Sequence, residues 1–225
     1  MPQQINKKIL LYFFLFIILG TFNNKNFNKF EFPKINRINI SGFETHNNNF
    51  LEKLEILKLN NLFLLKKSQI GELFDTNNLI EEYKIFKKYP SSLKVEIIKT
   101  KFLALLNIDG KTFFVGSNGK LIETKDNLKD LPYIFGNLDM NNFLSLKRII
   151  DNSTLEFKEI KNLYFFPSGR WDLELLSGIL IKLPNEKLKE SLDLSLNLLN
   201  NEKFVNVKLI DVRQKNQVIV NEQWN

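Results

Sequence analysis

One uninterrupted apolar stretch near the start of the chain constrains its fold more than any other feature. Residues 9–22 read Ile-Leu-Leu-Tyr-Phe-Phe-Leu-Phe-Ile-Ile-Leu-Gly-Thr-Phe and carry no charge. Lys7 and Lys8 come directly before them, and polar, Asn-rich chain follows from residue 23. Because the stretch is apolar on every face, it fits poorly as an amphipathic helix packed on a core. The stretch instead predicts a segment that enters a membrane.

Its length leaves three explanations of residues 9–22 open. A spanning helix needs about 20 apolar residues, and the stretch approaches this length if the flanking lysines extend to the membrane surface. A cleaved signal peptide has an apolar core of about 7–15 residues, but Phe22 stands where cleavage needs a small residue. A buried core helix is the third. We expect an anchor, with residues 1–8 cytoplasmic, although lysines on both sides leave the direction undecided by charge.

Composition excludes several classes of function. The chain has 225 residues, no cysteine, one histidine (His46) and a net charge of +7. Without cysteine it has no disulfide, thiolate metal site or cysteine nucleophile. The lysines are scattered singly, so the charge does not indicate a nucleic-acid partner. No Gly-rich phosphate-binding motif is present, and one loop histidine makes no catalytic set. We therefore expect no enzyme activity, cofactor, metal or small-molecule substrate.

The chain after the apolar stretch predicts an α+β protein. Residues 23–33 are polar and end at Pro33, as in a linker. Residues 79–89 fit a helix or a bulged strand equally well, because their apolar spacing matches both periods. Together with the neighbouring elements they predict one small domain over residues 34–101. Those neighbours are a strand at 34–42, helices at 49–58 and 68–74, and a strand at 93–99.

Hairpin signals dominate the rest of the chain, which we assign to a β domain over residues 102–225. Asp109-Gly110 and Ser117-Asn118-Gly119 are typical of tight turns between strands. Residues 131–136 contain a proline and are predicted to be a loop. We expect a mixed or antiparallel sheet with helices on one face. The predicted strands are 102–108, 112–115, 121–123, 157–166, 170–176, 179–183, 204–213 and 217–221, and the predicted helices are 142–150 and 185–200.

The last predicted strand offers a way to bind another protein. A terminal strand at 217–221 pairs on one side only, so its other row of N–H and C=O groups can accept a partner's strand. Arg213, just before the turn, can add a charge-assisted hydrogen bond to an acidic partner. The alternative is an ordinary edge strand with a solvated Arg213.

Short motifs follow one another in order along almost the whole chain. They are Ile38-Asn39-Ile40-Ser41-Gly42, Asn61-Leu62-Phe63, Tyr89-Pro90-Ser91-Ser92-Leu93-Lys94-Val95, Phe102-Leu103-Ala104, Gly119, Leu131-Pro132, Gly136, Arg170-Trp171-Asp172-Leu173, Gly178, Leu183-Pro184 and Ile210-Asp211-Val212-Arg213. Each motif is weak alone, and the ordered set is fairly specific. In this order they resemble the FtsQ/DivIB family of bacterial cell division proteins.

The resemblance implies a scaffold rather than an enzyme. It implies a single transmembrane helix at 9–22, a POTRA domain at 34–101 in which 79–89 is a strand, and a C-terminal β domain in the periplasm. Such a protein lies in the inner membrane at the division septum and links early and late division proteins. Its partners are FtsB and FtsL, with other division proteins bound through the POTRA domain.

The resemblance also implies a partner-binding site. An FtsB strand adds to the edge strand at 217–222, where Val218 and Val220 share one face, and Arg213 contacts an acidic FtsB side chain. Gln214 replaces a common Tyr, and Arg170 lies near a second basic contact. The implied site is Arg170, Arg213, Gln214, Gln217, Val218, Ile219, Val220 and Asn221. Two alternatives are a POTRA-containing assembly chaperone of the envelope and a signal-cleaved periplasmic hydrolase.

Overall fold

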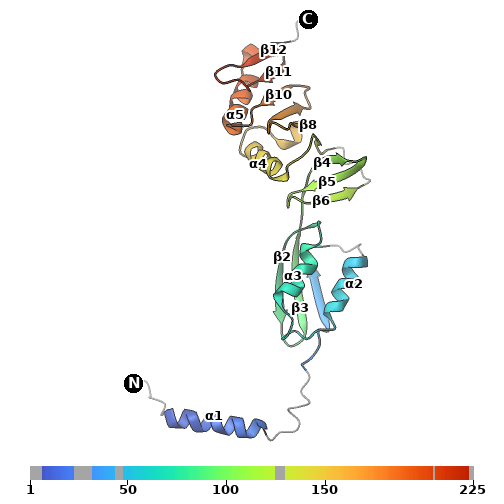
Figure 1. Ribbon diagram of the computed structural model, residues 1–225, viewed down its shortest axis with the longest axis vertical. Coiled ribbons are helices and arrows are strands. Elements are labelled where there is room, and N and C mark those ends of the chain that lie inside the picture. Colours follow the sequence, from blue (N-terminus) through green and yellow to red (C-terminus); the bar gives the residue numbers. More distant parts are fainter. Residues whose placement is uncertain (1–6, 23–31, 44–47, 125–129, 205, 223–225) are drawn as a thin grey trace. The chain divides into compact units, whose positions relative to one another are not determined.

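The computed structural model describes residues 7–22, 32–43, 48–124, 130–204 and 206–222 (Figure 1). The chain divides into two compact units. The first comprises Met1–Asn39, Thr45–Ile70 and Ile85–Val95, and the second comprises Ile40–Glu44, Gly71–Lys84 and Glu96–Asn225. The predicted tail and linker lie outside the described residues except for 7–8 and 32–33, as does His46. The predicted domain boundaries stay predictions.

The apolar stretch forms a helix, α1 (Lys7–Phe22), as expected for these residues. Its large apolar side chains are exposed along its length, from Ile9 to Leu19. In the part of the chain that the structure describes, no helix has both the length and the apolar character needed to cross a membrane. The predicted anchor stays a prediction.

A three-stranded sheet accounts for the expected strand–helix–helix–strand–strand order. Its strand order is β1-β3-β2. Residues that fitted a helix or a strand form strand β2, because Ile80, Tyr83 and Ile85 are more buried than the charged residues between them. Strand β3 alternates more regularly, with Leu93, Val95 and Ile97 buried. The elements are β1 (Arg37–Ser41), α2 (Asn48–Leu57), α3 (Lys67–Asp75), β2 (Ile80–Lys88) and β3 (Ser92–Lys99).

The second unit contains a nine-stranded sheet of order β12-β11-β10-β9-β8-β7-β4-β5-β6. Most neighbours are antiparallel, whereas β4 with β7, β7 with β8, and β10 with β11 are parallel. The sheet is therefore mixed, as expected. Its strands are β4 (Phe102–Ile108), β5 (Lys111–Gly116), β6 (Leu121–Thr124), β7 (Tyr133–Phe135), β8 (Ile160–Phe165), β9 (Trp171–Leu175), β10 (Leu180–Leu183), β11 (Val207–Asp211) and β12 (Ile219–Glu222).

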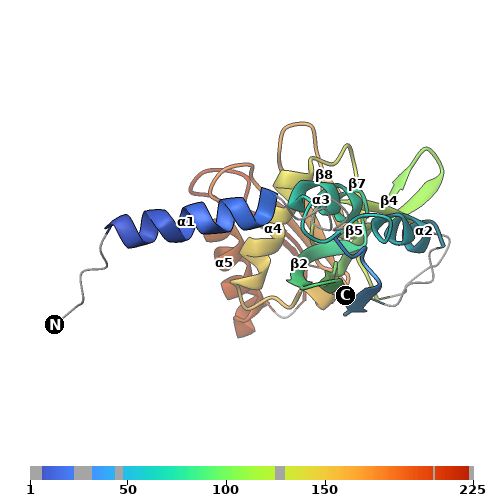
Figure 2. The ribbon, with the colours of Figure 1, turned by 90° about the horizontal axis from the view of Figure 1, so that it is seen from below.

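One face of this sheet is a continuous apolar core. Helices α4 (Met140–Asp151) and α5 (Leu188–Leu199) pack on it with Phe143, Leu146 and Leu192, which are fully buried. Figures 1 and 2 show both helices beside the strands of this unit. The strands meet the helices with residues in one register row, one from each of seven neighbouring strands. This core row is Leu106, Ile134, Leu163, Leu173, Ile181, Ile210 and Val220.

The opposite face carries a different row, because neighbouring residues of a strand point to opposite faces. This polar row is Phe135, Tyr164, Asp172, Lys182, Asp211 and Ile219. It combines aromatic rings with two carboxylates and one ammonium group. The charged side chains Asp172, Lys182 and Asp211 therefore lie on one surface of the sheet, because the register that builds the core also places them there.

Three details differ from the sequence-based expectations. The predicted loop at 131–136 contains β7, whose entry is held by a hydrogen bond from Leu105 N to Pro132 O of 2.9 Å. The predicted strand at 157–166 opens with a 3₁₀ turn, Phe157–Glu159, before β8. The last helix starts at Leu188 rather than 185, because Lys187 has a left-handed φ of 53° and so cannot continue a helix.

Candidate partner-binding edge

Strand β12 lies at one end of the nine-stranded sheet. It pairs antiparallel with β11, where Ile210 is opposite Val220 and Asp211 is opposite Ile219. Among the described residues, no strand pairs with its other side. Val220 packs against the core, whereas Ile219 points to the polar face and is 48% exposed. An edge strand of this kind leaves alternate N–H and C=O groups free to bond another strand.

The other end of the sheet is partly covered. Strand β6 ends the sheet there, and the Asn78 side chain donates to the Leu121 carbonyl at 2.8 Å. The turn before β6 is held to the same segment, since Asn118 Nδ2 donates to the carbonyls of Asn78 and Ile80, both at 2.9 Å. The two ends therefore differ, and β12 offers the more open edge.

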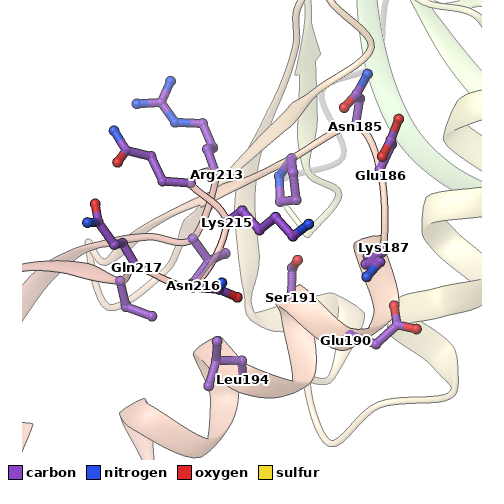
Figure 3. A pocket seen from close by; sticks show the side chains of 14 residues that line it. Asn185, Glu186, Lys187, Glu190, Ser191, Leu194, Arg213, Lys215, Asn216 and Gln217 are labelled. Carbon is purple, nitrogen blue, oxygen red and sulfur yellow. The ribbon is translucent and has the colours of Figure 1, made fainter.

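A groove of about 660 Å³ runs beside the loop that joins β11 to β12. Its walls come from the first turns of α5, with Ser191 and Leu194, and from the loop, with Gln217 and Val218 (Figure 3). Leu194 and Val218 are both exposed, so the groove has an apolar wall. Figure 3 shows that the Arg213 side chain points away from α5 at the rim of the groove.

Arg213 is held by Asp211, a contact that its sequence position did not reveal. Arg213 Nε donates to Asp211 Oδ1 at 2.8 Å and Arg213 Nη2 donates to Asp211 Oδ2 at 2.5 Å. The Arg213 backbone N–H also donates to Asp211 Oδ1 at 3.1 Å. Asp211 is the last residue of β11, and Arg213 follows two residues later, where the chain has left the strand. The guanidinium is therefore ordered before any partner arrives.

The pair shifts the pKa values of both groups toward their charged forms. The hydrogen bonds from Arg213, more than the opposing effect of burial, lower the pKa of Asp211. The bond to Asp211 likewise raises the pKa of Arg213. Asp211 is 7% exposed, so its charge is compensated almost entirely by the protein. The pair therefore stays ionised over the whole physiological range of pH.

The predicted site residues fall into three places. Arg213, Gln214, Gln217 and Val218 line the groove. Ile219, Val220 and Asn221 lie on β12. Arg170 lies just before β9, a strand separated from β12 by β10 and β11, and its guanidinium stacks 4.2 Å from the centroid of the Phe166 ring. Seven of the eight predicted residues therefore lie at one edge of the sheet, and the eighth, Arg170, is separated from that edge by two strands.

Asp172 occupies a similar position on β9 but has a different environment. Asp172 lies opposite Lys182 of β10, and Asp211 lies opposite the same lysine on the other side of β10. Asp172 is 6% exposed and its Oδ1 atom has no hydrogen-bond partner, as is also true of Arg170 Nε. Burial raises the pKa of Asp172, although the nearby Lys182, Arg170 and Arg213 charges oppose the rise.

Glu174, two residues further along β9, accepts hydrogen bonds from three side chains. Asn162 Nδ2, Tyr164 OH and Lys161 Nζ donate to it at 2.8, 2.9 and 3.0 Å. These three hydrogen bonds lower the pKa of Glu174 to about 2. The Tyr164 ring in turn stacks on Phe135. No group of three or more His, Asp or Glu side chains within the described ranges is placed to hold a metal ion.

Part of the chain matches a known protein family. The family model described as "Cell division protein FtsQ/DivIB, C-terminal" matches residues 104–213, which include most of the nine-stranded sheet. The matches support the FtsQ/DivIB family for this chain. The match ends at Arg213, so the case for an open β12 edge in this chain rests on its own geometry.

Curated relatives carry the same family names. The chain is 24% identical over 176 residues to the cell division protein FtsQ of Rickettsia bellii, which covers 76% of this chain and 65% of that protein. It is 29% identical over 133 residues to the cell division protein DivIB of Clostridium botulinum strain Loch Maree, which covers 59% of this chain and 50% of the relative. The chain thus spans between half and two thirds of these relatives. Their names support a role in cell division.

One solved structure is also similar. It is the major extracytoplasmic domain, trans isomer, of the bacterial cell division protein DivIB from Geobacillus stearothermophilus. The identity is 15%, the TM-score is 0.34, and the likeness covers 41% of this chain and 85% of that one. A likeness at this level supports no conclusion about the site.

Proposed function

We propose that this protein is a non-enzymatic scaffold of the bacterial division machinery that binds an FtsB strand along β12 and, through FtsB, also FtsL. The observation that carries the proposal is the position of β12 at an open end of a nine-stranded sheet. A strand that adds there gains main-chain hydrogen bonds in addition to side-chain contacts. The family match points to the same class of function, because the matched proteins are named as cell division proteins.

Side chains around the edge support strand addition. Ile219 is exposed on the polar face and offers an apolar contact to a neighbouring strand. On the other face Val218 and Leu194 give the groove an apolar wall beside the edge. Arg213 adds an ordered cation at the rim, which suits an acidic side chain on FtsB.

Location in the cell is the second part of the proposal. We propose that residues 9–22 anchor the protein in the inner membrane, with residues 1–8 in the cytoplasm, the rest in the periplasm at the septum, and residues 34–101 binding further division proteins. The composition of residues 9–22 supports this arrangement, since they carry no charge and are apolar on every face. Protease treatment of intact spheroplasts tests it. Digestion of the segment after residue 32 supports the proposal, whereas protection of that segment contradicts it.

A pair of proline substitutions tests the edge mechanism. Successive N–H groups of an edge strand point in opposite directions, so those of Ile219 and Val220 differ. Amide exchange of the free protein tells which is bonded to β11, since that amide exchanges slowly. Proline at the outward position removes one donor to the partner and clashes with an added strand, but keeps the β11 ladder intact.

FtsB binding and thermal unfolding are then measured for both variants of the full chain. We expect the outward variant to unfold at the wild-type temperature and to lose FtsB binding by at least about 100-fold. The inward variant is the matched control, and we expect its unfolding temperature to fall. Wild-type FtsB binding by a normally folded outward variant would contradict the proposal.

A further inference from the structure

We infer that Asp211 is a positioning residue for partner binding, which holds Arg213 so that only the outer end of its guanidinium can accept a partner carboxylate. The inference rests on the proposed function, because it concerns how the β12 edge selects its partner. It assigns a role to a side chain that never needs to touch the partner.

The geometry of the pair fixes which guanidinium atoms are free. A guanidinium has five N–H groups, one on Nε and two on each Nη atom. Asp211 accepts from Nε and from Nη2 of Arg213, so it occupies the side edge of the planar group. The end edge, formed by Nη1 and the second N–H of Nη2, takes no part in the hydrogen bonds to Asp211. Two parallel N–H groups at such an edge match the two oxygens of one carboxylate.

Asp211 is well placed to act as an anchor. It is 7% exposed and lies in a strand with neighbours on both sides, opposite Lys182 of β10 and Ile219 of β12. The backbone N–H of Arg213 donates to the same carboxylate, which limits its rotation. Arg213 is a long side chain that loses rotamer entropy when it binds. Part of that loss has already occurred in the free protein, which favours binding.

The charge of the pair changes what the partner must supply. Asp211 compensates the charge of Arg213, so a partner carboxylate gains directed hydrogen bonds more than a net attraction. Lys182, opposite Asp211 and without an ion pair among the described residues, leaves a modest positive charge nearby. We therefore expect binding to depend strictly on the guanidinium geometry and only weakly on salt.

The register also selects the face on which the partner's carboxylate lies. Asp211 and Ile219 are on the polar face, whereas Val220 points to the core on the other side. Because neighbouring strands are about 4.8 Å apart, a strand added beside β12 lies about 9.6 Å from β11, so a long acidic side chain must reach back across β12 to the guanidinium held by Asp211. The partner strand must then carry its acidic residue on the Ile219 face. A shift by one residue turns that residue to the α5 side.

A measurement without a partner tests the positioning directly. The Arg213 Nε–H signal is followed by proton–nitrogen NMR in the full chain and in Asp211→Asn, which keeps the side-chain shape and loses the charge. We expect hydrogen exchange at Nε to become about tenfold faster or more in the variant. Equal exchange in the two proteins would overturn the inference, whatever the partner proves to be. Asp151→Asn, which alters an exposed Lys147–Asp151 pair, is the control and should leave the signal unchanged.

A binding experiment then asks whether the positioning matters for function. Affinity for FtsB is measured for Asp211→Asn, for Arg213→Lys and for the double variant. Lysine keeps the charge but cannot bond two oxygens in one plane. We expect each single variant to bind FtsB about tenfold more weakly than wild type. The double variant should bind no more weakly than either single variant, because both changes remove the same feature. Additive losses, or full affinity in Asp211→Asn, would contradict the inference.

Failure of the inference and failure of the proposed function give different results. Full affinity in Asp211→Asn together with lost binding in Arg213→Ala means that the arginine binds without help from Asp211. Full affinity in both Arg213→Ala and the outward proline variant means that the β12 edge is not the partner site. Wild-type unfolding temperatures for these variants are required in each case, so that lost binding reports on the edge rather than on the fold.

Discussion

Two aspartates on the polar face of the sheet have similar positions and opposite environments. Asp172 and Asp211 each lie opposite Lys182, and each is two residues from an arginine. Arg213 turns back and bonds Asp211 through two nitrogens. Arg170 stacks on an aromatic ring instead, and Asp172 Oδ1 is left without a hydrogen bond. The pKa of Asp211 is lowered by its hydrogen bonds, whereas burial raises the pKa of Asp172.

The comparison teaches that spacing brings charges to one face without deciding which of them pair. A guanidinium gains both stacking and cation–π attraction over an aromatic ring. The Phe166 ring, 4.2 Å from the Arg170 guanidinium carbon, therefore competes with Asp172 for that arginine. The hydrogen-bonded pair of Asp211 and Arg213, here the closed pair, lies at the edge proposed to bind a partner, where an ordered cation is useful. Asp172 and Arg170, here the open pair, lie further inside the sheet.

The largest expected effect comes from breaking the closed pair. Asp211→Ala removes the acceptor for three hydrogen bonds and leaves the Arg213 charge uncompensated. We expect the free energy of unfolding to fall by about 2 kcal/mol at pH 7. Urea unfolding of the full chain, followed by circular dichroism, measures it. A loss no greater than that of Asp151→Ala, at an exposed pair, would show that the closed pair does not stabilise the fold.

Glu174 extends the comparison along the strand that carries Asp172. Its pKa is lowered to about 2, so its hydrogen bonds stabilise the protein above its ordinary pKa of 4.5 and are lost as the pH falls toward 2. We expect Glu174→Gln to reduce the free energy of unfolding by about 1 kcal/mol at pH 7. The difference from wild type should shrink between pH 4.5 and pH 2. A difference that stays constant over this range would contradict the assigned hydrogen bonds.

The smallest expected effect has the opposite sign and belongs to the open carboxylate. The pKa of Asp172 lies above its ordinary 3.8 because of burial, so the ionised form costs stability at neutral pH. We expect Asp172→Asn to raise the free energy of unfolding by about 0.5 kcal/mol at pH 7. The gain should vanish below pH 3.8, where the carboxyl is neutral in both folded and unfolded chains. A destabilised Asn variant at pH 7 would remove the contrast between the two aspartates.

Much of the fold follows from residue patterns. The apolar stretch at 9–22 forms a helix, and the order of the five following elements is as expected, although the strand at 79–89 is implied by the resemblance and left open by periodicity. Turn residues such as Asp109-Gly110 lie between the strands that they predict, because only a few residue types tolerate a positive φ there. The terminal hairpin also follows from its alternation and its turn. Local periodicity therefore carries most of the element assignment.

Other features depend on contacts between distant parts of the chain. Strand β7 has three residues, Tyr133–Phe135, too few to show an alternating pattern, and it is a strand because it pairs parallel with β4 and β8. The bond between Arg213 and Asp211 depends on a rotamer choice, since the same spacing leaves Arg170 and Asp172 apart. A spacing of two residues between an arginine and an aspartate does not predict which rotamer the arginine adopts.

Amide hydrogen exchange of β12 with and without FtsB tests the central claim most directly. In the free protein the amides bonded to β11 exchange slowly, and the alternate amides, which point outward, exchange fast. We predict that FtsB slows the outward amides within Ile219–Glu222 and leaves the inward ones as they are. If FtsB binds the full chain and the outward amides exchange as fast as before, the β12 edge is not where the partner's strand adds.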